Sequence, residues 1–148
     1  MASTTELKAL EDISALLTTG MFSDVTLVAG EKTAVAHKSI LAARSPVFAA
    51  LFAELSNAEN RVELDVQADV LDHFLAFIYA GKVPALEPKM AQDLLAAAEK
   101  YKLEQLKSIA EDYICGLLSF ESVPSLLQFA EAVNASKLKD MCLELLNR

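Results

Sequence analysis

The sequence predicts an α+β fold, with a small β-sheet flanked by helices and followed by an α-helical hairpin. Residues 24–28 alternate with β-branched side chains, Gly30-Glu31 offers a turn, and residues 32–36 can return as a second strand. Over most of the remaining chain, apolar residues recur every three or four positions, which indicates amphipathic helices. The last such stretch, residues 119–148, predicts the hairpin.

The N-terminal segment predicts a helix over residues 4–18. Ser3 and Glu6 have the spacing of a capping box, in which each side chain accepts a backbone N–H of the other residue. Apolar side chains then share one helical face: Leu7, Leu10, Ile13, Leu16 and Leu17. We expect Gly20 to end this helix.

Two short helices are expected after the strand pair. Helix formers begin at His37, and Ser45-Pro46 predicts an N-cap followed by the proline favoured in a first helical turn. Residues 54–60 lose the helical period and predict an exposed loop. Residues 61–64 alternate polar and apolar side chains, so we expect a third strand with one buried face.

The later part of the chain predicts helices only. A strongly apolar helix around residues 70–78 should be closed by Gly81, because glycine readily adopts the left-handed conformation of a helix end. A second helix is expected over 89–105, where the charged residues, including Glu99, form a solvated face. A third follows around residues 106–117.

The hairpin should consist of two helices joined by a turn at Asn134-Ala135-Ser136. Its first helix is expected to start near Ser122, since Pro124 lacks an N–H and cannot lie deep in a helix.

Composition narrows the classes of function. The 148 residues fit one compact domain, and 53% hydrophobic residues can build a sizeable core. No apolar run of about 18 residues is present, so we expect no membrane contact. The net charge of −8 and the scattered basic residues argue against nucleic acid as a partner. With no signal-peptide pattern and only two cysteines, the chain is expected to be intracellular.

No residue pattern indicates catalysis, and we expect a protein that is not an enzyme. His37, His73, Cys115 and Cys142 are too widely spaced for a metal site, so no metal is expected. Ser45 lacks the sharp turn that a catalytic serine needs, and its role as a helix cap explains it better. Glycine-rich phosphate loops are absent, so we expect neither a cofactor nor a small-molecule substrate.

Several motifs follow one another in a specific order. They are Asp24-Val25-Thr26-Leu27, Ala36-His37-Lys38, Leu41-Ala42-Ala43-Arg44-Ser45-Pro46-Val47-Phe48, Asn60-Arg61-Val62-Glu63-Leu64 and Phe77-Ile78-Tyr79-Ala80-Gly81-Lys82. Together they resemble the BTB/POZ domain. The stretches 93–101 and 103–107 resemble its MATH-BTB branch, the speckle-type POZ proteins. The resemblance implies a BTB/POZ fold over residues 1–118 and a helical extension of the cullin-binding type over 119–148.

The resemblance also implies a homodimer, formed through the first helix and the helix after the His-Lys pair. On this sequence the dimer interface would contain Leu10, Ile13, Leu16, Leu17 and Ile40. The alternative, which the sequence leaves open, is that all of these residues belong to the protomer's own core.

Asp24 and Lys38 match a charged pair at the base of the family's central groove. Because an isolated buried charge is costly, we expect each to contact the other or a neighbouring backbone group. A structural role and a peptide-docking role both remain open.

MATH-BTB proteins bind cullin-3, so the resemblance implies a substrate adaptor of a cullin-3 ubiquitin ligase. The cullin-binding residues would be Phe52, Leu55, Asn57, Glu59, Tyr101, Lys102, Leu126 and Phe129. The loop at 54–60 departs from the family, which usually places Glu two positions after an apolar residue, where this chain has Asn57 after Leu55. Losing that charge-assisted hydrogen bond costs about 1.5–3 kcal/mol, so weakened cullin binding is expected.

Two other interpretations remain. A BTB domain of a transcriptional regulator could dimerise and bind corepressor peptides without any link to cullin-3, and the altered 54–60 loop favours this. The other interpretation is that the chain is a version of such a domain engineered for dimer assembly. No substrate-binding domain is recognisable in the sequence, so a piece of a larger protein or a stand-alone domain is expected. The resemblance places the protein in the nucleus, the cytoplasm or both.

Overall fold

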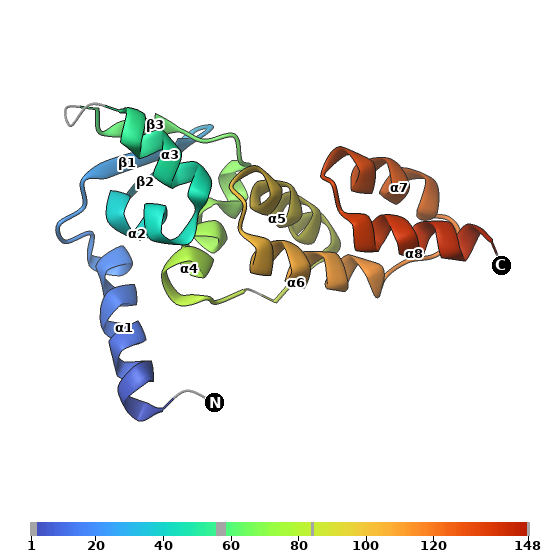
Figure 1. Cartoon of the computed structure of the whole chain (residues 1–148), viewed down its shortest axis with the longest axis horizontal. Coiled ribbons are helices and arrows are strands. Elements are labelled where there is room, and N and C mark those ends of the chain that lie inside the picture. Colours follow the sequence, from blue (N-terminus) through green and yellow to red (C-terminus); the bar gives the residue numbers. More distant parts are fainter. Residues whose placement is uncertain (1–2, 56–58, 84, 148) are drawn as a thin grey trace. The chain divides into compact units, whose positions relative to one another are not determined.

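The computed structural model describes residues 3–55, 59–83 and 85–147 (Figure 1). The chain forms two compact units, residues 1–84 and 85–148, which we describe separately. The sequence analysis placed a domain boundary at residue 118. That boundary is where the resemblance to the family ends, whereas the two units are separated by packing, so it stays a prediction.

The first unit contains a three-stranded sheet among its described residues, in the order β2-β1-β3. Strand β1 (Val25–Ala29) pairs antiparallel with β2 (Lys32–Ala36), Leu27 lying opposite Ala34. The two strands are joined through Gly30, whose φ of +61° suits glycine. On its other edge, β1 pairs parallel with β3 (Arg61–Glu63), Leu27 lying opposite Val62.

The first unit also contains helices. They are α1 (Thr4–Thr19), α2 (Lys38–Arg44), α3 (Pro46–Glu54), the short 3-10 helix η1 (Ala68–Val70) and α4 (Leu71–Ala80). The predicted caps are confirmed. Ser3 and Glu6 form a capping box, Ser45 accepts the N–H of Phe48, and Gly81 is left-handed at the end of α4.

The second unit is helical, with α5 (Pro88–Lys100), α6 (Glu104–Cys115), α7 (Val123–Ala132) and α8 (Ser136–Leu146). The start of α7 beside Ser122 and the turn before α8 are as predicted. All of these helices contribute to one buried cluster, for example Leu95 from α5, Ile114 from α6, Val123 from α7 and Leu138 from α8. The hairpin therefore shares its core with α5 and α6 rather than forming a core of its own.

Two predictions for this unit are wrong. The helix expected over 89–105 ends at Lys100, and Lys102 has a φ of +55° before α6 begins. Glu99 does not lie on a solvated face. It is mostly buried and contacts Lys107 and Asn134, because α6 and the turn after α7 pack beside the end of α5.

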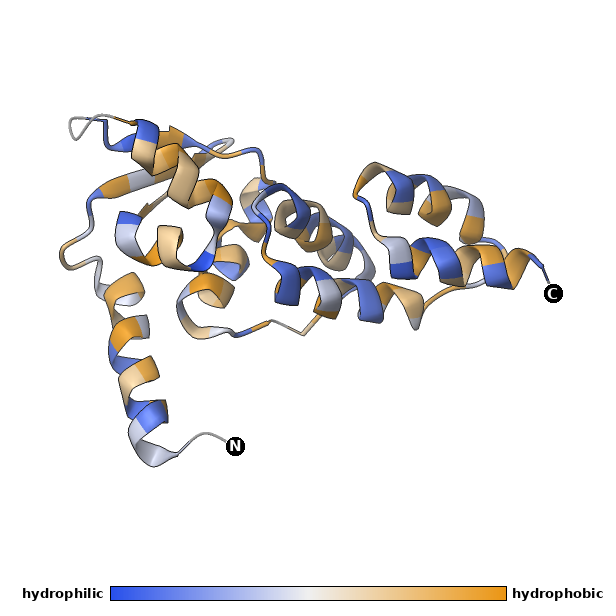
Figure 2. Ribbon diagram, viewed as in Figure 1, coloured by the Kyte–Doolittle hydropathy of each residue, from blue (hydrophilic) through white to orange (hydrophobic). Residues whose placement is uncertain are grey.

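Helix α1 differs from the other long helices. None of its sixteen residues, all of which the structure describes, is buried. In Figure 2 its ribbon carries hydrophobic segments along its length, interrupted by hydrophilic ones. Its apolar face is therefore only partly covered, by α4.

The described helices include none with the length and apolar character needed to cross a membrane.

Candidate functional site

A groove of about 480 Å³ lies where α1, α2 and α4 meet. Its lining is mainly apolar. The residues are Leu10 and Ile13 from α1, Ser39, Ile40, Ala43 and Arg44 from α2, and Ile78, Tyr79, Ala80 and Gly81 from the end of α4. Residues far apart in sequence thus form one surface of the first unit.

Three residues of the predicted dimer interface line this groove, namely Leu10, Ile13 and Ile40. Leu10 is 41% exposed and Ile13 48% exposed, although both are large and apolar. Leu16 and Leu17 are half-buried. The alternative in which all five belong to the protomer's own core is therefore not what the packing shows.

Polar contacts hold the walls of the groove in place. The Ser14 hydroxyl donates to Leu10 O at 2.7 Å and lies 3.3 Å from Tyr79 O at the end of α4. Arg44 Nε donates to Ile78 O at 3.0 Å. These contacts satisfy carbonyls at the C-terminal end of α4 and connect it to both neighbouring helices.

His37 and Tyr79 form a buried hydrogen-bonded pair beside the groove. His37 Nε2 lies 2.6 Å from Met21 O, and because a carbonyl only accepts, Nε2 carries the proton. Nδ1 then accepts from the Tyr79 hydroxyl at 2.7 Å, and that hydroxyl accepts the His37 backbone N–H at 2.9 Å. Burial raises the pKa of Tyr79, so the phenol stays protonated and can donate.

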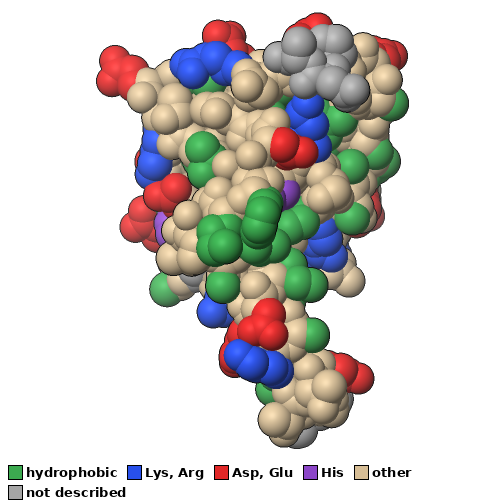
Figure 3. Space-filling model, turned by 90° about the vertical axis from the view of Figure 1, so that its left-hand side faces the viewer, with side chains coloured by type: hydrophobic (Ala, Val, Ile, Leu, Met, Phe, Trp, Pro, Cys, Tyr) green, Lys and Arg blue, Asp and Glu red, His purple; other side chains and the backbone are tan. Residues whose placement is uncertain are grey.

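The segment between α1 and β1 exposes two large apolar side chains that the sequence analysis missed. Met21 is 55% exposed and Phe22 is 85% exposed. Figure 3 looks onto the face of the first unit where α1 joins it, and hydrophobic side chains are gathered in the middle of that face, next to a histidine. The sequence does contain a signal for this exposed pair, because two large apolar residues directly follow Gly20, which ends α1.

Asp24 and Lys38 contact each other, but not as an ion pair. Asp24 Oδ1 accepts the Lys38 backbone N–H at 2.7 Å, at the start of α2. The Lys38 ammonium instead donates to Glu59 O at 2.9 Å and lies 5.9 Å from the Phe52 ring centroid. Asp24 is exposed. The role of the two residues as a groove pair stays a prediction.

The predicted cullin-binding residues of the first unit lie around the end of α3. Phe52 is half-buried and stacks on Phe48 with ring centroids 5.6 Å apart. Leu55 caps α3 and is half-buried, while Glu59 is exposed. Asn57 lies outside the described residues.

The predicted cullin-binding residues of the second unit differ in exposure. Tyr101 and Leu126 are buried, Phe129 is half-buried, and Lys102 is exposed. Leu126 also lines a cleft of about 240 Å³, which Leu117 borders as an exposed apolar residue. Accessible apolar surface in this unit therefore lies beside Leu126 rather than on it.

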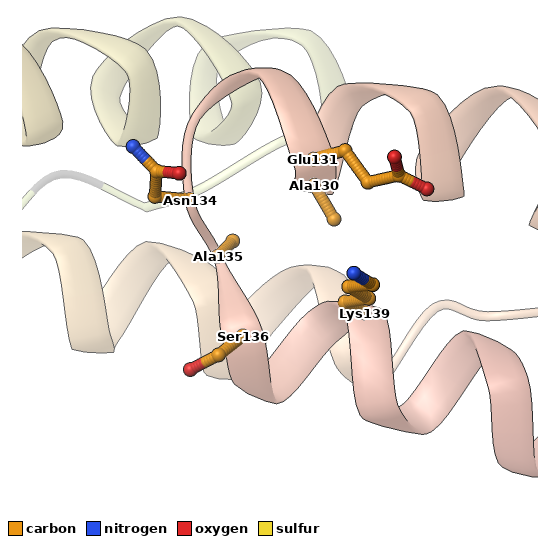
Figure 4. A pocket seen from close by; sticks show the side chains of 6 residues that line it. All are labelled: Ala130, Glu131, Asn134, Ala135, Ser136 and Lys139. Atoms are coloured by element: carbon orange, nitrogen blue, oxygen red, sulfur yellow. The ribbon is translucent and has the colours of Figure 1, made fainter.

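The turn between α7 and α8 carries a more polar pocket of about 350 Å³ (Figure 4). Glu131 comes from the end of α7, and Lys139 from the first turns of α8. Beside it, Asn134 Nδ2 donates to Glu99 at 2.9 Å, and Lys107 donates to Asn134 O at 2.9 Å. The hydrogen bond from Asn134, followed by the hydrogen bond and the positive charge of Lys107, holds the pKa of Glu99 below its usual range.

Among residues 3–55, 59–83 and 85–147, no group of three or more His, Cys, Asp or Glu side chains is placed to hold a metal ion.

Comparison with known proteins gives two findings. The family model described as "BTB/POZ domain" matches residues 13–118, well over half of the chain. Among solved structures, the BTB domain of zebrafish PATZ1 is similar with a TM-score of 0.66 and 25% sequence identity. That similarity covers 77% of this chain and 94% of the zebrafish domain.

Proposed function

Because this chain belongs to the BTB/POZ domain family, whose members are protein-interaction modules, we propose that it is a homodimeric interaction domain whose protomers meet along α1. The observation that carries the proposal is the groove bounded by α1, α2 and α4, together with a helix that has no buried residue. The three apolar residues Leu10, Ile13 and Ile40 line that groove. An amphipathic helix obtains most of its stability from packing of its apolar face, which a second protomer would supply.

Sedimentation of the wild type beside Ile13→Asp tests the dimer. Ile13 is 48% exposed in the protomer, so the substitution should leave the fold intact. In a two-fold interface it buries two carboxylates, and we expect the dimer dissociation constant to rise about a hundredfold or more. Thr5→Asp, which adds the same charge in the first turn of α1, is the matched control and should still dimerise. If the wild type and Ile13→Asp both sediment as monomers, the dimer proposal is wrong.

As the finer function, we propose a substrate-adaptor module of a cullin-3 ubiquitin ligase, working in the nucleus or cytoplasm. The proposal rests on the resemblance to the MATH-BTB branch and on the helix pair α7–α8. Two observations support it in the separate units. Leu55 is half-buried at the start of the predicted binding loop, and Phe129 of α7 is only partly covered. Binding should be weaker than in relatives that carry Glu in place of Asn57.

Calorimetric titration with the N-terminal domain of cullin-3 tests this proposal. We expect measurable heat, reduced by Leu55→Asp and unaffected by Ile109→Asp, which places the same charge on an exposed apolar position of α6. No heat at high micromolar concentration would exclude the adaptor function.

The rival proposal is a scaffold that binds corepressor peptides and not cullin-3. The departure at Asn57 favours it, because the family's charge-assisted hydrogen bond cannot form there. If the wild type dimerises but gives no heat in the titration with cullin-3, the scaffold function is favoured over the adaptor function.

A further inference from the structure

The second unit contains an apolar cleft that the proposed dimer does not use. We call it the α5–α7 cleft, because its walls come from the start of α5, the end of α6 with the segment after it, and the start of α7. We define it by Pro88, Gln92, Ile114, Leu117, Ser122 and Leu126. Leu117 is 47% exposed although it is large and apolar, so apolar surface is accessible at the rim.

The size of the cleft favours one side chain over a whole ligand molecule. Its volume is about 240 Å³, whereas pockets for small-molecule ligands usually enclose about 300–1,000 Å³. Ile114 and Leu126 are buried members of the hydrophobic core of this unit, so they form a well-packed floor. A cleft with a packed apolar floor and an accessible rim suits one large apolar side chain of a partner.

One polar group in the wall is available to a peptide backbone. Gln92 of α5 is half-buried, and its side-chain amide makes no hydrogen bond to any other residue that the structure describes. An amide both donates and accepts, as does each peptide unit of an extended chain, so Gln92 can pair with the backbone of a bound segment. The hydroxyl of Ser122 is already engaged, because it donates to Ser119 O at 3.1 Å.

Unpaired acidic residues lie beside the cleft. Glu87 and Glu121 each directly precede, in the sequence, a residue that lines it. Both are exposed, and within the described part of the chain neither forms an ion pair. Lys89, the cation nearest to Glu87 in the sequence, donates to Asp93 at 2.8 Å, so its charge is already balanced. The surroundings of the cleft therefore attract a segment that carries Lys or Arg.

We infer that the α5–α7 cleft binds a short segment of a partner protein, which inserts one large apolar side chain and places Lys or Arg beside it. Repulsion by Glu87 and Glu121 discriminates against an acidic segment with the same apolar residue. The cleft lies within one unit, so the inference goes beyond the proposed dimer and does not depend on it. Of the residues predicted to bind cullin-3, only Leu126 lines the cleft, so the two surfaces are largely separate.

Selection from a displayed library of random heptapeptides, with the full chain as the target, tests the chemistry of the partner. We expect enriched sequences in which a large apolar residue has Lys or Arg within two positions. A parallel selection on Leu117→Ser should not enrich these sequences, because the apolar rim of the cleft is lost. The inference is wrong if the enriched sequences are acidic, if Leu117→Ser enriches the same ones, or if none is enriched.

Fluorescence anisotropy with one enriched peptide, labelled with fluorescein, measures the apolar and the electrostatic contributions separately. Leu117→Ser should weaken binding about tenfold or more, whereas Ile109→Ser, at another exposed apolar position, should not. Glu121→Lys should weaken binding about fivefold at low salt and less at high salt, because ions screen exposed charges. Asp140→Lys, which reverses an exposed charge of α8, is the matched control and should bind like the wild type.

The substituted side chains are all exposed, so the thermal midpoints of the variants should match that of the wild type. An affinity that Glu121→Lys leaves unchanged at low salt would overturn the basic character of the partner. If the N-terminal domain of cullin-3 displaces the peptide, the cleft is part of the cullin site and the inference is wrong. A monomeric wild type, or one that gives no heat with cullin-3, would refute the proposed function and leave peptide binding unaffected.

Discussion

Removing the Tyr79 hydroxyl should destabilise the first unit markedly. Tyr79→Phe keeps the aromatic ring and its packing but takes away the oxygen that accepts the His37 backbone N–H and donates to His37 Nδ1. Both residues are buried, with His37 5% exposed and Tyr79 3% exposed. Water therefore cannot replace the lost partner without a change in packing.

The magnitude follows from the two groups left unsatisfied. A buried donor or acceptor without a partner costs about 1–3 kcal/mol, so we expect a loss of about 3 kcal/mol for the pair. For a chain of this size, that lowers the thermal midpoint by about 6–12 °C. Urea unfolding followed by far-ultraviolet circular dichroism measures the free energy without relying on the altered tyrosine.

Tyr113→Phe is the matched control, because Tyr113 is also partly covered by a hydrophobic core but lies in the second unit. It should change the unfolding free energy by less than about 0.5 kcal/mol. Nitrogen chemical shifts of His37 give an independent check, because the hydrogen bonds place the proton on Nε2 and make Nδ1 the acceptor. If Tyr79→Phe unfolds like the wild type, or if Nδ1 carries the proton, the assigned hydrogen bonds are wrong.

Three further predictions concern the second unit. Glu99 has a lowered pKa in the folded state, so its contribution is present above the ordinary value of 4.5 and is lost as pH falls below it. Glu99→Gln should therefore cost about 1–2 kcal/mol at neutral pH, with the difference in midpoint from the wild type disappearing in a series of acidic melts. Glu111→Ala should cost about 1–3 kcal/mol in urea unfolding, since it frees the buried Leu138 N–H in the first turn of α8; an unchanged midpoint would contradict this capping role. Burial raises the pKa of Cys115 and Cys142, so native protein should react with a thiol reagent far more slowly than protein in urea, and equal rates would show that the thiols are accessible.

The sequence predicted those elements whose ends are set by local chemistry. The capping box at Ser3, the serine and proline that open α3, and the left-handed Gly81 each depend on a few neighbouring residues. By contrast, the end of α5 has no such signal. Lys102 takes a left-handed conformation that nothing in its residue type favours.

The candidate site was predictable to a similar extent. The helical period and the family resemblance named Leu10 and Ile13, and both line the groove. They could not show that Phe22 is exposed, because exposure depends on what the rest of the unit covers. They also could not pair Glu99 with Asn134, since these side chains are 35 residues apart and meet only when the helices pack.

The unequal connections of the sheet imply an order of assembly. Strand β2 follows β1 after a tight turn, whereas β3 reaches β1 only after roughly thirty residues that include α2 and α3. Closing the longer segment costs about 2 kcal/mol more chain entropy than closing the shorter one. We therefore expect the β-hairpin of β1 and β2 to form early. Strand β3 should join late, because only three of its residues are in register with β1. In the native protein, β3 should also be the first strand to detach, and its amides should exchange with solvent sooner than those shared by β1 and β2.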